Sequence, residues 1–345
     1  MLRFLNQRRK TRALIITGAT SVAITSMSPL LAQTTDTDNG ANTNETLAPI
    51  QVIGEGGERY VPTTTSSATK TQTPIEEVPQ SISVITEEQI EDQGSASLEE
   101  ALRYEPGVLV RPFGRDRRFN QFEVRGFSGT TDNTYNNGLQ VANGTFTVPR
   151  IEPYGQERIE ILRGPSSVLF GSGSPGGIVN TVSKRAPEKL LGEVGVEYGS
   201  HDWKQAKLDV GGPLGDGTGI FGRVTALARD ADTVIDKTRN DKLFIAPTVR
   251  FELGDDTRFT LLASYQREEQ YAFGTLPIEG TARDNPNGKI DRDFFIGDPN
   301  FDNFETERFS AGYELEHRLN DTVTLKQNAR YAEVTNQQTT LFGSG

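Results

Sequence analysis

The second half of the chain consists mainly of segments in which apolar and polar residues alternate. Apolar residues occupy every second position from Leu243 to Leu253, and a similar period recurs in 259–265 and 309–319. A period of two places alternate side chains on opposite faces, so each segment predicts a β-strand with one apolar face. Further segments of this kind lie at 194–198, 206–210, 220–228 and 323–331. We therefore expect seven strands within residues 188–345.

The links between these strands alternate in length. Short links lie at 214–217, 253–256 and 319–322, whereas the links 229–242 and 267–307 are long and polar. Short turns at one end and long loops at the other are typical of outer-membrane β-barrels, whereas the strands of a β-sandwich are usually shorter. Seven strands cannot close such a barrel, because an open edge in lipid leaves backbone groups unpaired. We therefore expect a fragment, a truncated product or one piece of a split protein.

Residues 74–187 show a different pattern, in which short strands and helices are mixed. The segment 78–85 alternates like a strand. The pairs Thr86/Gln89 and Ser97/Glu100 have the spacing of helix capping boxes, so each predicts a short helix, the second over 98–104. Short strands are expected after them, at 108–110, 122–127 and 157–163. The pattern therefore predicts a small α+β domain.

The N-terminal segment 1–32 has the features of a secretory signal peptide. Five basic residues precede an apolar run from Ala13 to Ile24, and Ala32 offers a cleavage site. The apolar run is too short and too interrupted to serve as a membrane anchor. Residues 33–73 are rich in small polar residues, so we expect a disordered periplasmic segment there. Within it, 48–54 is a short apolar patch suited to β-strand addition to a partner.

Composition narrows the classes of function. Hydrophobic residues make up only 34% of the chain and the mean hydropathy is −0.51, which suits a barrel with a wet interior better than an enzyme core. The net charge of −11 becomes −16 (−11 − 5) without the signal peptide, which disfavours a nucleic-acid partner. The chain has no cysteine, and His201 and His317 stand far apart. We therefore expect no catalytic residues and no metal site.

A glycine-rich string at 171–176 raises the alternative of a dinucleotide-binding oxidoreductase. It satisfies the spacing G-x-G-x-x-G and follows an apolar run. However, the β-branched segment 178–183 that follows predicts a strand, and without a helix N-terminus nothing there would hold a pyrophosphate. We therefore expect these glycines to form a tight turn between two strands.

Six strings in residues 74–187 resemble, in their order and spacing, the plug domain of TonB-dependent siderophore receptors. The string Arg150-Ile-Glu-Pro-Tyr154 resembles the ferrichrome-type, hydroxamate branch of this family most. The resemblance extends from about residue 46 to the end of the chain. The six strings are Val78–Ile85, Leu102–Val108, Val124–Phe127, Asn137–Leu139, Glu157–Gly171 and Ser174–Asn180 with Ser183-Lys-Arg185.

This resemblance implies an α+β plug domain followed by the first seven antiparallel strands of a 22-stranded outer-membrane β-barrel. It also implies TonB-driven uptake of a ferric siderophore, with no cofactor and no enzymatic activity, because the siderophore itself holds the iron. The implied partners are the ferric siderophore, TonB with its ExbB/ExbD energising complex, and outer-membrane lipid. In such receptors the apolar patch would be the TonB box, formed by Ala48, Pro49, Ile50, Gln51, Val52, Ile53 and Gly54.

Two loops, 111–122 and 140–149, would form the plug apex that meets the ligand. Aromatic surface and hydrogen-bond donors there suit a hydroxamate chelate rich in carbonyl oxygens. An exposed, solvated loop is the alternative for the arginines. By resemblance, Arg125 and Arg163 would lock the plug to glutamates of the barrel wall. The candidate ligand-binding residues are Phe113, Arg115, Arg117, Arg118, Phe119 and Phe146.

Other readings of the same sequence predict different features. A passive porin would have neither a plug nor a TonB box. A receptor coupled to transcription would carry a further domain before the TonB box, where this chain has only residues 33–45. Cobalamin, haem or another chelate is an alternative cargo, and a non-functional truncated product is an alternative to a working receptor.

Overall fold

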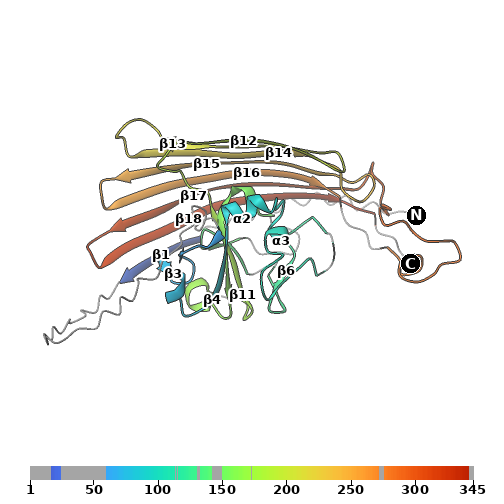
Figure 1. Cartoon of the computed structure of the whole chain (residues 1–345), viewed down its shortest axis with the longest axis horizontal. Helices are drawn as coiled ribbons and strands as arrows, with labels where there is room; N and C mark the ends of the chain where they lie inside the picture. The colour runs from blue at the N-terminus through green and yellow to red at the C-terminus, as the bar shows by residue number, and fades with distance from the viewer. Residues whose placement is uncertain are drawn as a thin grey trace, which may run out of the picture.

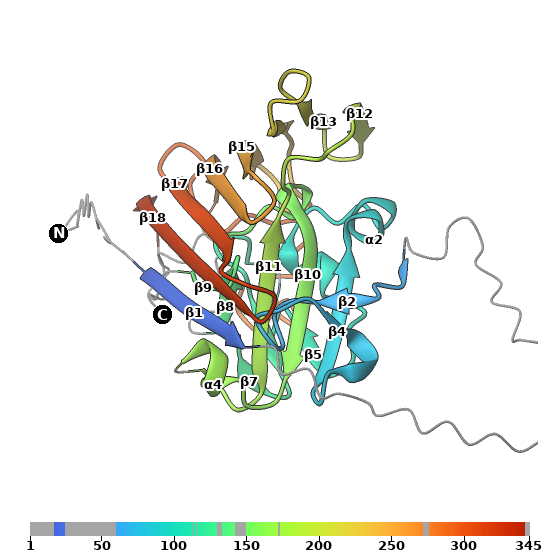
Figure 2. The ribbon, with the colours of Figure 1, turned by 90° about the vertical axis from the view of Figure 1, so that its left-hand side faces the viewer.

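The computed structural model describes residues 17–24 and 60–341, apart from 113, 115, 130–132, 142–149, 172 and 272–275. It has two parts. One is a broad sheet of long antiparallel strands, here called the wall sheet (β12–β18), and the other is a compact α+β unit, here called the plug unit (residues 60–187). The plug unit lies against one face of the wall sheet (Figure 1), and the end-on view shows the wall sheet curving around one side of it (Figure 2).

The wall sheet is an up-and-down meander in which each strand pairs antiparallel with the next. It confirms the seven strands predicted from the alternating pattern. The strands are longer than the alternating segments because polar residues continue the pairing at both ends. Their bounds are β12 (Leu191–Gly199), β13 (Trp203–Pro213), β14 (Ile220–Asp230), β15 (Asn240–Leu253), β16 (Thr257–Gln270), β17 (Asn303–Arg318) and β18 (Val323–Thr339).

The wall sheet turns its apolar residues outward and its polar residues toward the plug unit. On β15, Leu243 is 47% exposed, whereas the neighbouring Lys242 is 4% exposed. On β12, Val194 and Tyr198 are 77% and 82% exposed. This is the reverse of a soluble sheet, whose apolar face is buried, and it is the arrangement of a barrel wall with lipid outside.

The links of the wall sheet follow the predicted alternation. The links 254–256 and 319–322 are short turns, whereas β16 and β17 are separated by residues 271–302. The link between β12 and β13, residues 200–202, is short although it lies at the end with the long loops. Among the described residues, no helix is long and apolar enough to cross a membrane.

The plug unit is built on a five-stranded sheet in the order β4-β10-β11-β8-β9. The central strand β10 (Gln156–Arg163) pairs antiparallel with β4 (Ser81–Thr86) and β11 (Gly177–Ser183). β8 (Thr134–Asn136) runs parallel to β11 and turns back into β9 (Leu139–Gln140). A second sheet contains β5 (Val108–Val110), β6 (Phe122–Val124) and β7 (Phe127–Ser128).

The helices of the plug unit begin where the capping boxes predicted them. The Thr86 hydroxyl accepts a hydrogen bond from the Gln89 amide at the start of α2 (Glu87–Asp92), and Ser97 caps α3 (Leu98–Ala101) in the same way. α3 ends three residues earlier than expected, before a series of turns. Leu98, Ala101 and Leu102 are buried in the core with Phe122 and Ile159. The remaining short helices are η1 (Ile75–Glu77), η2 (Pro153–Gly155) and α4 (Ser167–Phe170).

The glycine-rich string leads into a strand and not into a helix. β11 begins at Gly177, directly after the turn, as the β-branched sequence predicted. A Cβ atom on Gly177 would lie 2.2 Å from the backbone oxygen of Leu162, and one on Gly176 would lie 2.1 Å from that of Val124. These glycines therefore allow close backbone packing inside the plug unit.

The boundary expected at residue 74 differs from the structure, because residues 60–73 are part of the plug unit. β2 (Thr64–Thr65) and β3 (Thr73–Pro74) pair with each other, and Thr65, Ser67 and Ala68 are buried. Thr65 and Ser67 bind the buried carboxylate of Glu160, 93 to 95 residues away in the sequence. A composition that predicts disorder is therefore ordered by hydrogen bonds to a distant strand.

Two expectations about the N-terminal region remain predictions. The TonB box expected at 48–54 lies outside the described residues. Within the segment expected to be a signal peptide, residues 17–24 form β1 (Thr17–Ile24), which pairs antiparallel with the edge strand β18. Cleavage after Ala32 would remove β1 and leave the outer edge of β18 for another strand.

Candidate plug apex and plug–wall interface

The structure describes half of the candidate ligand-binding residues. Phe113, Arg115 and Phe146 lie outside the described residues, whereas Arg117, Arg118 and Phe119 lie in the loop between β5 and β6. All three described side chains are half-buried. Their assignment to ligand binding stays a prediction.

The charge of Arg118 is compensated within its own loop. Its Nε and Nη2 atoms donate to the two carboxylate oxygens of Asp116 at 2.9 and 2.6 Å. Its guanidinium lies 5.6 Å from the centre of the Phe119 ring and 6.0 Å from that of Phe304 on β17. The apex loop therefore reaches the wall sheet through an aromatic contact that the sequence did not indicate.

Arg117 lies among other buried charges. Burial lowers its pKa to about 10, and the nearby positive charge of Arg150 acts in the same direction, while Glu100 opposes both. No described carboxylate is within ion-pair distance of Arg117. Of the apex arginines that the structure describes, Arg117 is therefore the one whose charge is less compensated, because Arg118 has its own carboxylate.

The two arginines expected to lock the plug differ in their surroundings. Arg163 is 7% exposed and donates to Pro106 O, to Ser83 Oγ and to Glu105 Oε2, at 2.8, 2.8 and 3.1 Å. All these partners belong to the plug unit. Arg125 is exposed and has a left-handed backbone with φ of 53°, which its amide supports by donating to Gly107 O. Their contact with wall glutamates stays a prediction.

The contacts that hold the plug unit to the described wall are mostly ionic and polar, together with one apolar cluster of Tyr154 with Leu227 and Phe244. The first ionic cluster surrounds Lys184, the residue after β11, whose Nζ lies 2.9 Å from Asp209 on β13. The same Nζ lies 2.7 Å from Glu87 on α2, and Arg223 on β14 contacts Asp209 at 2.6 Å and Glu87 at 3.0 Å. Lys184 also lies over the ring of Tyr154.

A second cluster lies nearer to the long loops of the wall. The Nζ of Lys242 on β15 lies 2.7 Å from Glu152 in the plug unit and 2.6 Å from Glu268 on β16. Arg150 is 4.0 Å from Glu268, and its backbone oxygen accepts a hydrogen bond from Gln266. All these charged side chains are buried, so their charges must compensate one another locally.

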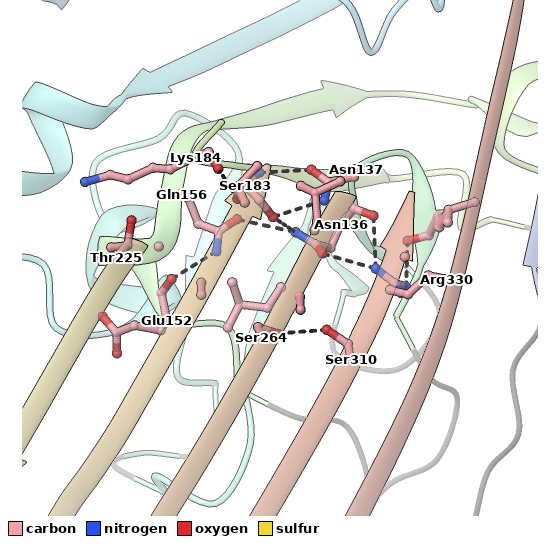
Figure 3. A pocket seen from close by; sticks show the side chains of 18 of the residues that line it. Asn136, Asn137, Glu152, Gln156, Ser183, Lys184, Thr225, Ser264, Ser310 and Arg330 are labelled. Carbon is pink, nitrogen blue, oxygen red and sulfur yellow. Dashed lines mark hydrogen bonds between the residues drawn. The ribbon is translucent and has the colours of Figure 1, made fainter. Parts of the chain in front are cut away.

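Further contacts tie the plug unit to β17 and β18. Arg185 donates twice to Glu314, at 3.1 and 2.6 Å. Arg330 donates to the backbone oxygens of Asn136 and Gln140, and Asn328 donates to that of Asn137. Asn136, Asn137, Glu314, Asn328 and Arg330 line a cavity of about 60 Å³ between the plug unit and the wall sheet, which has room for water molecules (Figure 3). Apolar side chains such as Ile151 and Phe244 complete the lining. Figure 3 shows Asn136, Asn137 and Arg330 at one end of the cavity, with Ser264 and Ser310 joined on the wall.

Sequence reasoning did not find this interface. Several interface residues belong to strings that were singled out, namely Asn137, Arg150, Glu152, Tyr154, Lys184 and Arg185, but none of them was given a role in holding the wall. A usable signal lies in the inward positions of the alternating strands, where charged residues such as Asp209, Arg223 and Glu314 replace small polar ones. Among the described residues, no group of three or more His, Asp or Glu side chains could hold a metal ion.

Comparison with known proteins agrees with this arrangement. Residues 74–178 match the family described as TonB-dependent Receptor Plug Domain. The chain is 39% identical over 285 residues to the ferrichrome outer membrane transporter/phage receptor of Escherichia coli K12, covering 81% of this chain and 38% of that protein. It is 36% identical over 270 residues to the ferrioxamine B receptor of Salmonella typhimurium SL1344, covering 77% and 38%. The chain thus spans less than half the length of these curated relatives.

Solved structures of receptors have the same fold. The closed form of the ferric-catecholate import receptor Fiu from Escherichia coli K12 superimposes with a TM-score of 0.72 at 25% identity, covering 81% of this chain and 40% of that one. The pyoverdine outer membrane receptor FpvA of Pseudomonas aeruginosa PAO1, bound to pyoverdine, gives a TM-score of 0.69 at 26% identity, covering 79% and 40%.

Proposed function

Because this chain belongs to the TonB-dependent receptor family and corresponds to the N-terminal portion of its siderophore receptors, we propose that it serves the uptake of a ferric siderophore. The family places it in the cell outer membrane, as a plug domain with part of the barrel wall. The proposed cargo is a hydroxamate chelate of the ferrichrome or ferrioxamine type. The proposed energy source is TonB, acting on residues 48–54.

One observation supports this function above the others, namely the ionic character of the plug–wall interface. A plug that must move needs contacts that fix its position without burying much apolar surface. Buried ion pairs suit this requirement, because their mutual attraction is largely offset by the cost of removing both charges from water. Lys184 and Glu152 supply buried contacts of this kind and Arg185 a half-buried one, to three regions of the wall.

The proposed path of the ligand begins at the plug apex. There Arg117 and the aromatic ring of Phe119 offer a half-buried surface with one poorly compensated charge. A ferric hydroxamate presents carbonyl oxygens around the metal, and these accept hydrogen bonds from guanidinium groups. Iron stays within the siderophore, so this chain needs to provide no metal ligands.

The test is uptake of radioactive iron by cells whose only siderophore receptor is a complete receptor that begins with this chain. We expect ferric ferrichrome to enter when TonB is present and to bind without entering when TonB is absent. Deletion of 48–54 should abolish entry and leave binding unchanged. Uptake of cobalamin or haem, with no response to ferric hydroxamates, would replace the proposed cargo. Entry without TonB would contradict the proposed mechanism.

A further inference from the structure

We propose that Glu160 is a clasp that holds residues 64–70 against the plug sheet, and that an inward pull on the upstream chain must open this clasp first. The inference rests on the proposed function, because it assigns a positioning role in the TonB-driven step to one buried side chain. It concerns the part of the plug unit that the sequence predicted to be disordered.

The carboxylate of Glu160 is fully buried and faces the segment directly. Its Oε2 accepts from the Thr65 hydroxyl at 2.8 Å and from the Ser67 amide at 3.0 Å. Its Oε1 accepts from Arg158 Nε at 2.6 Å. One carboxylate oxygen thus serves the segment and the other serves β10.

Two neighbouring side chains also bind the segment. Arg158 Nη2 donates to the Ser66 hydroxyl at 3.1 Å, and Asn180 on β11 donates to the Ser67 hydroxyl at 2.7 Å. The three gripping side chains therefore come from the two strands at the centre of the plug sheet. Each of residues 65–67 meets at least one of them, and together these contacts fix the position of the segment along the strands.

The segment also covers apolar surface of the plug sheet. Ala68 packs in a small core with Tyr135, Leu162 and Ile178, on the face of the sheet opposite to the main core. The Lys70 ammonium lies 3.4 Å from the centre of the Phe170 ring. Opening the clasp would therefore expose this second face to water.

The electrostatics of Glu160 agree with a clasp that depends on the segment. Burial alone would raise its pKa, but the charge of Arg158 and the hydrogen bonds from Ser67 and Thr65 lower the pKa below the usual value. Two of the groups that hold the ionised form, Thr65 and Ser67, would leave with the segment, whereas Arg158 would stay on β10.

The position of the clasp in the chain determines the order of events. A pull that arrives from residues before Thr64 loads residues 64–70 before it reaches β4. Beyond the clasp, the chain continues from Asn180 along β11 and then to Lys184 and Arg185, which hold the wall at Asp209 and Glu314. The clasp thus lies between the upstream chain and the wall contacts.

The first experiment measures opening of the clasp in the full chain. The chain has no cysteine, so Ala68→Cys introduces a single thiol at a position that is 8% exposed. Its rate of reaction with a maleimide, relative to the urea-unfolded chain, reports how often the segment opens. Adding Glu160→Gln should raise this relative rate by about tenfold or more, because a hydrogen bond to a charged group is lost.

Matched variants separate the clasp from general destabilisation. Thr65→Val removes one donor and should also raise the rate, whereas Thr64→Val, at the exposed neighbouring position, should leave it unchanged. A thiol in the main core, Ala101→Cys, should remain protected when Glu160→Gln is added. If Glu160→Gln leaves the labelling rate of Ala68→Cys unchanged, or raises that of Ala101→Cys equally, the proposed role of Glu160 is wrong.

The second experiment tests whether the clasp must open during uptake. The pair Ser67→Cys and Asn180→Cys replaces two side chains in hydrogen-bond contact and should form a disulfide. In a complete receptor, the oxidised pair should bind ferric ferrichrome but not import it, and reduction should restore import. Import by the oxidised receptor would overturn the inference. Failure of the proposed cargo would appear instead as loss of ferrichrome binding by the unmodified receptor.

Discussion

The ammonium group of Lys242 on the wall strand β15 lies 2.7 Å from the carboxylate of Glu152 in the plug unit, and each side chain is 1% exposed. Glu268 on β16 completes the group at 2.6 Å from the same ammonium. A lone charge at such a depth would be strongly unfavourable, so each member depends on the others. The wall and the plug unit are therefore coupled through a charge balance that neither part has alone.

Replacing Lys242 by Met should weaken attachment of the plug unit by about 3–5 kcal/mol, because two carboxylates then remain buried without their cation. Trp203 can report this change. It is the only tryptophan, and it borders a small pocket that Gly94 and Ser95 of the plug unit also line. The measurement is the urea midpoint of Trp203 fluorescence.

The control for this variant is Arg318→Gln, which breaks an exposed pair with Asp256 at the end of β17. Exposed pairs contribute little to stability, so its midpoint should not move. Equal shifts in the two variants would mean that burial of the Lys242 group does not hold the plug unit.

Arg163 and Arg125 should behave differently when each is replaced by Met. Arg163→Met removes a buried guanidinium that binds the half-buried Glu105 carboxylate, Ser83 Oγ and Pro106 O, so the plug unit itself should lose roughly 1–3 kcal/mol of stability. Arg125→Met, at an exposed position, should leave the urea midpoint almost unchanged.

The same two residues allow a test of the predicted plug–wall lock. In a complete receptor, Arg125→Glu combined with Arg163→Glu should let large antibiotics leak into the cell. Arg125→Glu alone is the cleaner variant, because the plug fold does not depend on its side chain. Unchanged permeability of both variants would contradict the prediction that Arg125 and Arg163 hold the plug to glutamates of the wall.

Gly177→Ala should disrupt the plug sheet. The residue has a φ of 133°, and an added Cβ would lie 2.2 Å from Leu162 O, so we expect a loss of roughly 3 kcal/mol or more. Gly192→Ala on β12, where a Cβ meets nothing within 4 Å, is the control. Labelling of Ala101→Cys reports the result, and a protected thiol in the Gly177→Ala chain would show that the close approach is not required.

Docking of residues 64–70 should become stronger as the pH rises from about 8 to 10.5. Burial lowers the pKa of Lys70 from 10.5 to about 8 in the docked segment, although Glu160 opposes the shift. The docked state therefore binds fewer protons than the released state over this range, and a higher pH favours it. Below pH 8 this contribution is lost.

Labelling of Ala68→Cys at each pH, relative to the unfolded chain, measures this dependence. The relative rate should fall by up to about a hundredfold between pH 8 and 10.5, since each pKa unit corresponds to about a tenfold change and the shift is more than two units. In a Lys70→Met background the relative rate should stay constant. A dependence that persists in this background would belong to another group.

The sequence predicted the elements whose signals are local. Alternation from Leu243 to Leu253 depends only on neighbouring residues, and so does the spacing of Thr86 and Gln89; both predictions were confirmed. The ordered structure of residues 60–73 could not be predicted from such local signals. Their order depends on Glu160, which no local pattern connects to Thr65.

In the candidate site, too, local features were predictable from the sequence, whereas contacts between distant residues were not. Aromatic and basic residues in 111–122 indicated an apex loop, but the sequence did not show that Asp116 would compensate Arg118. The pairing of Lys184 with Asp209, or of Arg185 with Glu314, joins residues 25 and 129 positions apart. Such pairs are set by how the plug unit docks on the wall, and a single sequence does not contain that geometry in readable form.

The ionic plug–wall interface also determines what each surface becomes once the two separate. A wall face that presents Asp209, Arg223 and Glu314 to water is largely hydrophilic, so a polar cargo would meet mainly polar side chains along it. The matching face of the plug unit, with Lys184 and Arg185, is equally soluble when free. Separation uncovers one small apolar cluster, in which Tyr154 of the plug unit packs against Leu227 and Phe244 of the wall, and otherwise polar and charged surface. Both parts therefore expose little hydrophobic surface when they separate, which favours their reunion over aggregation.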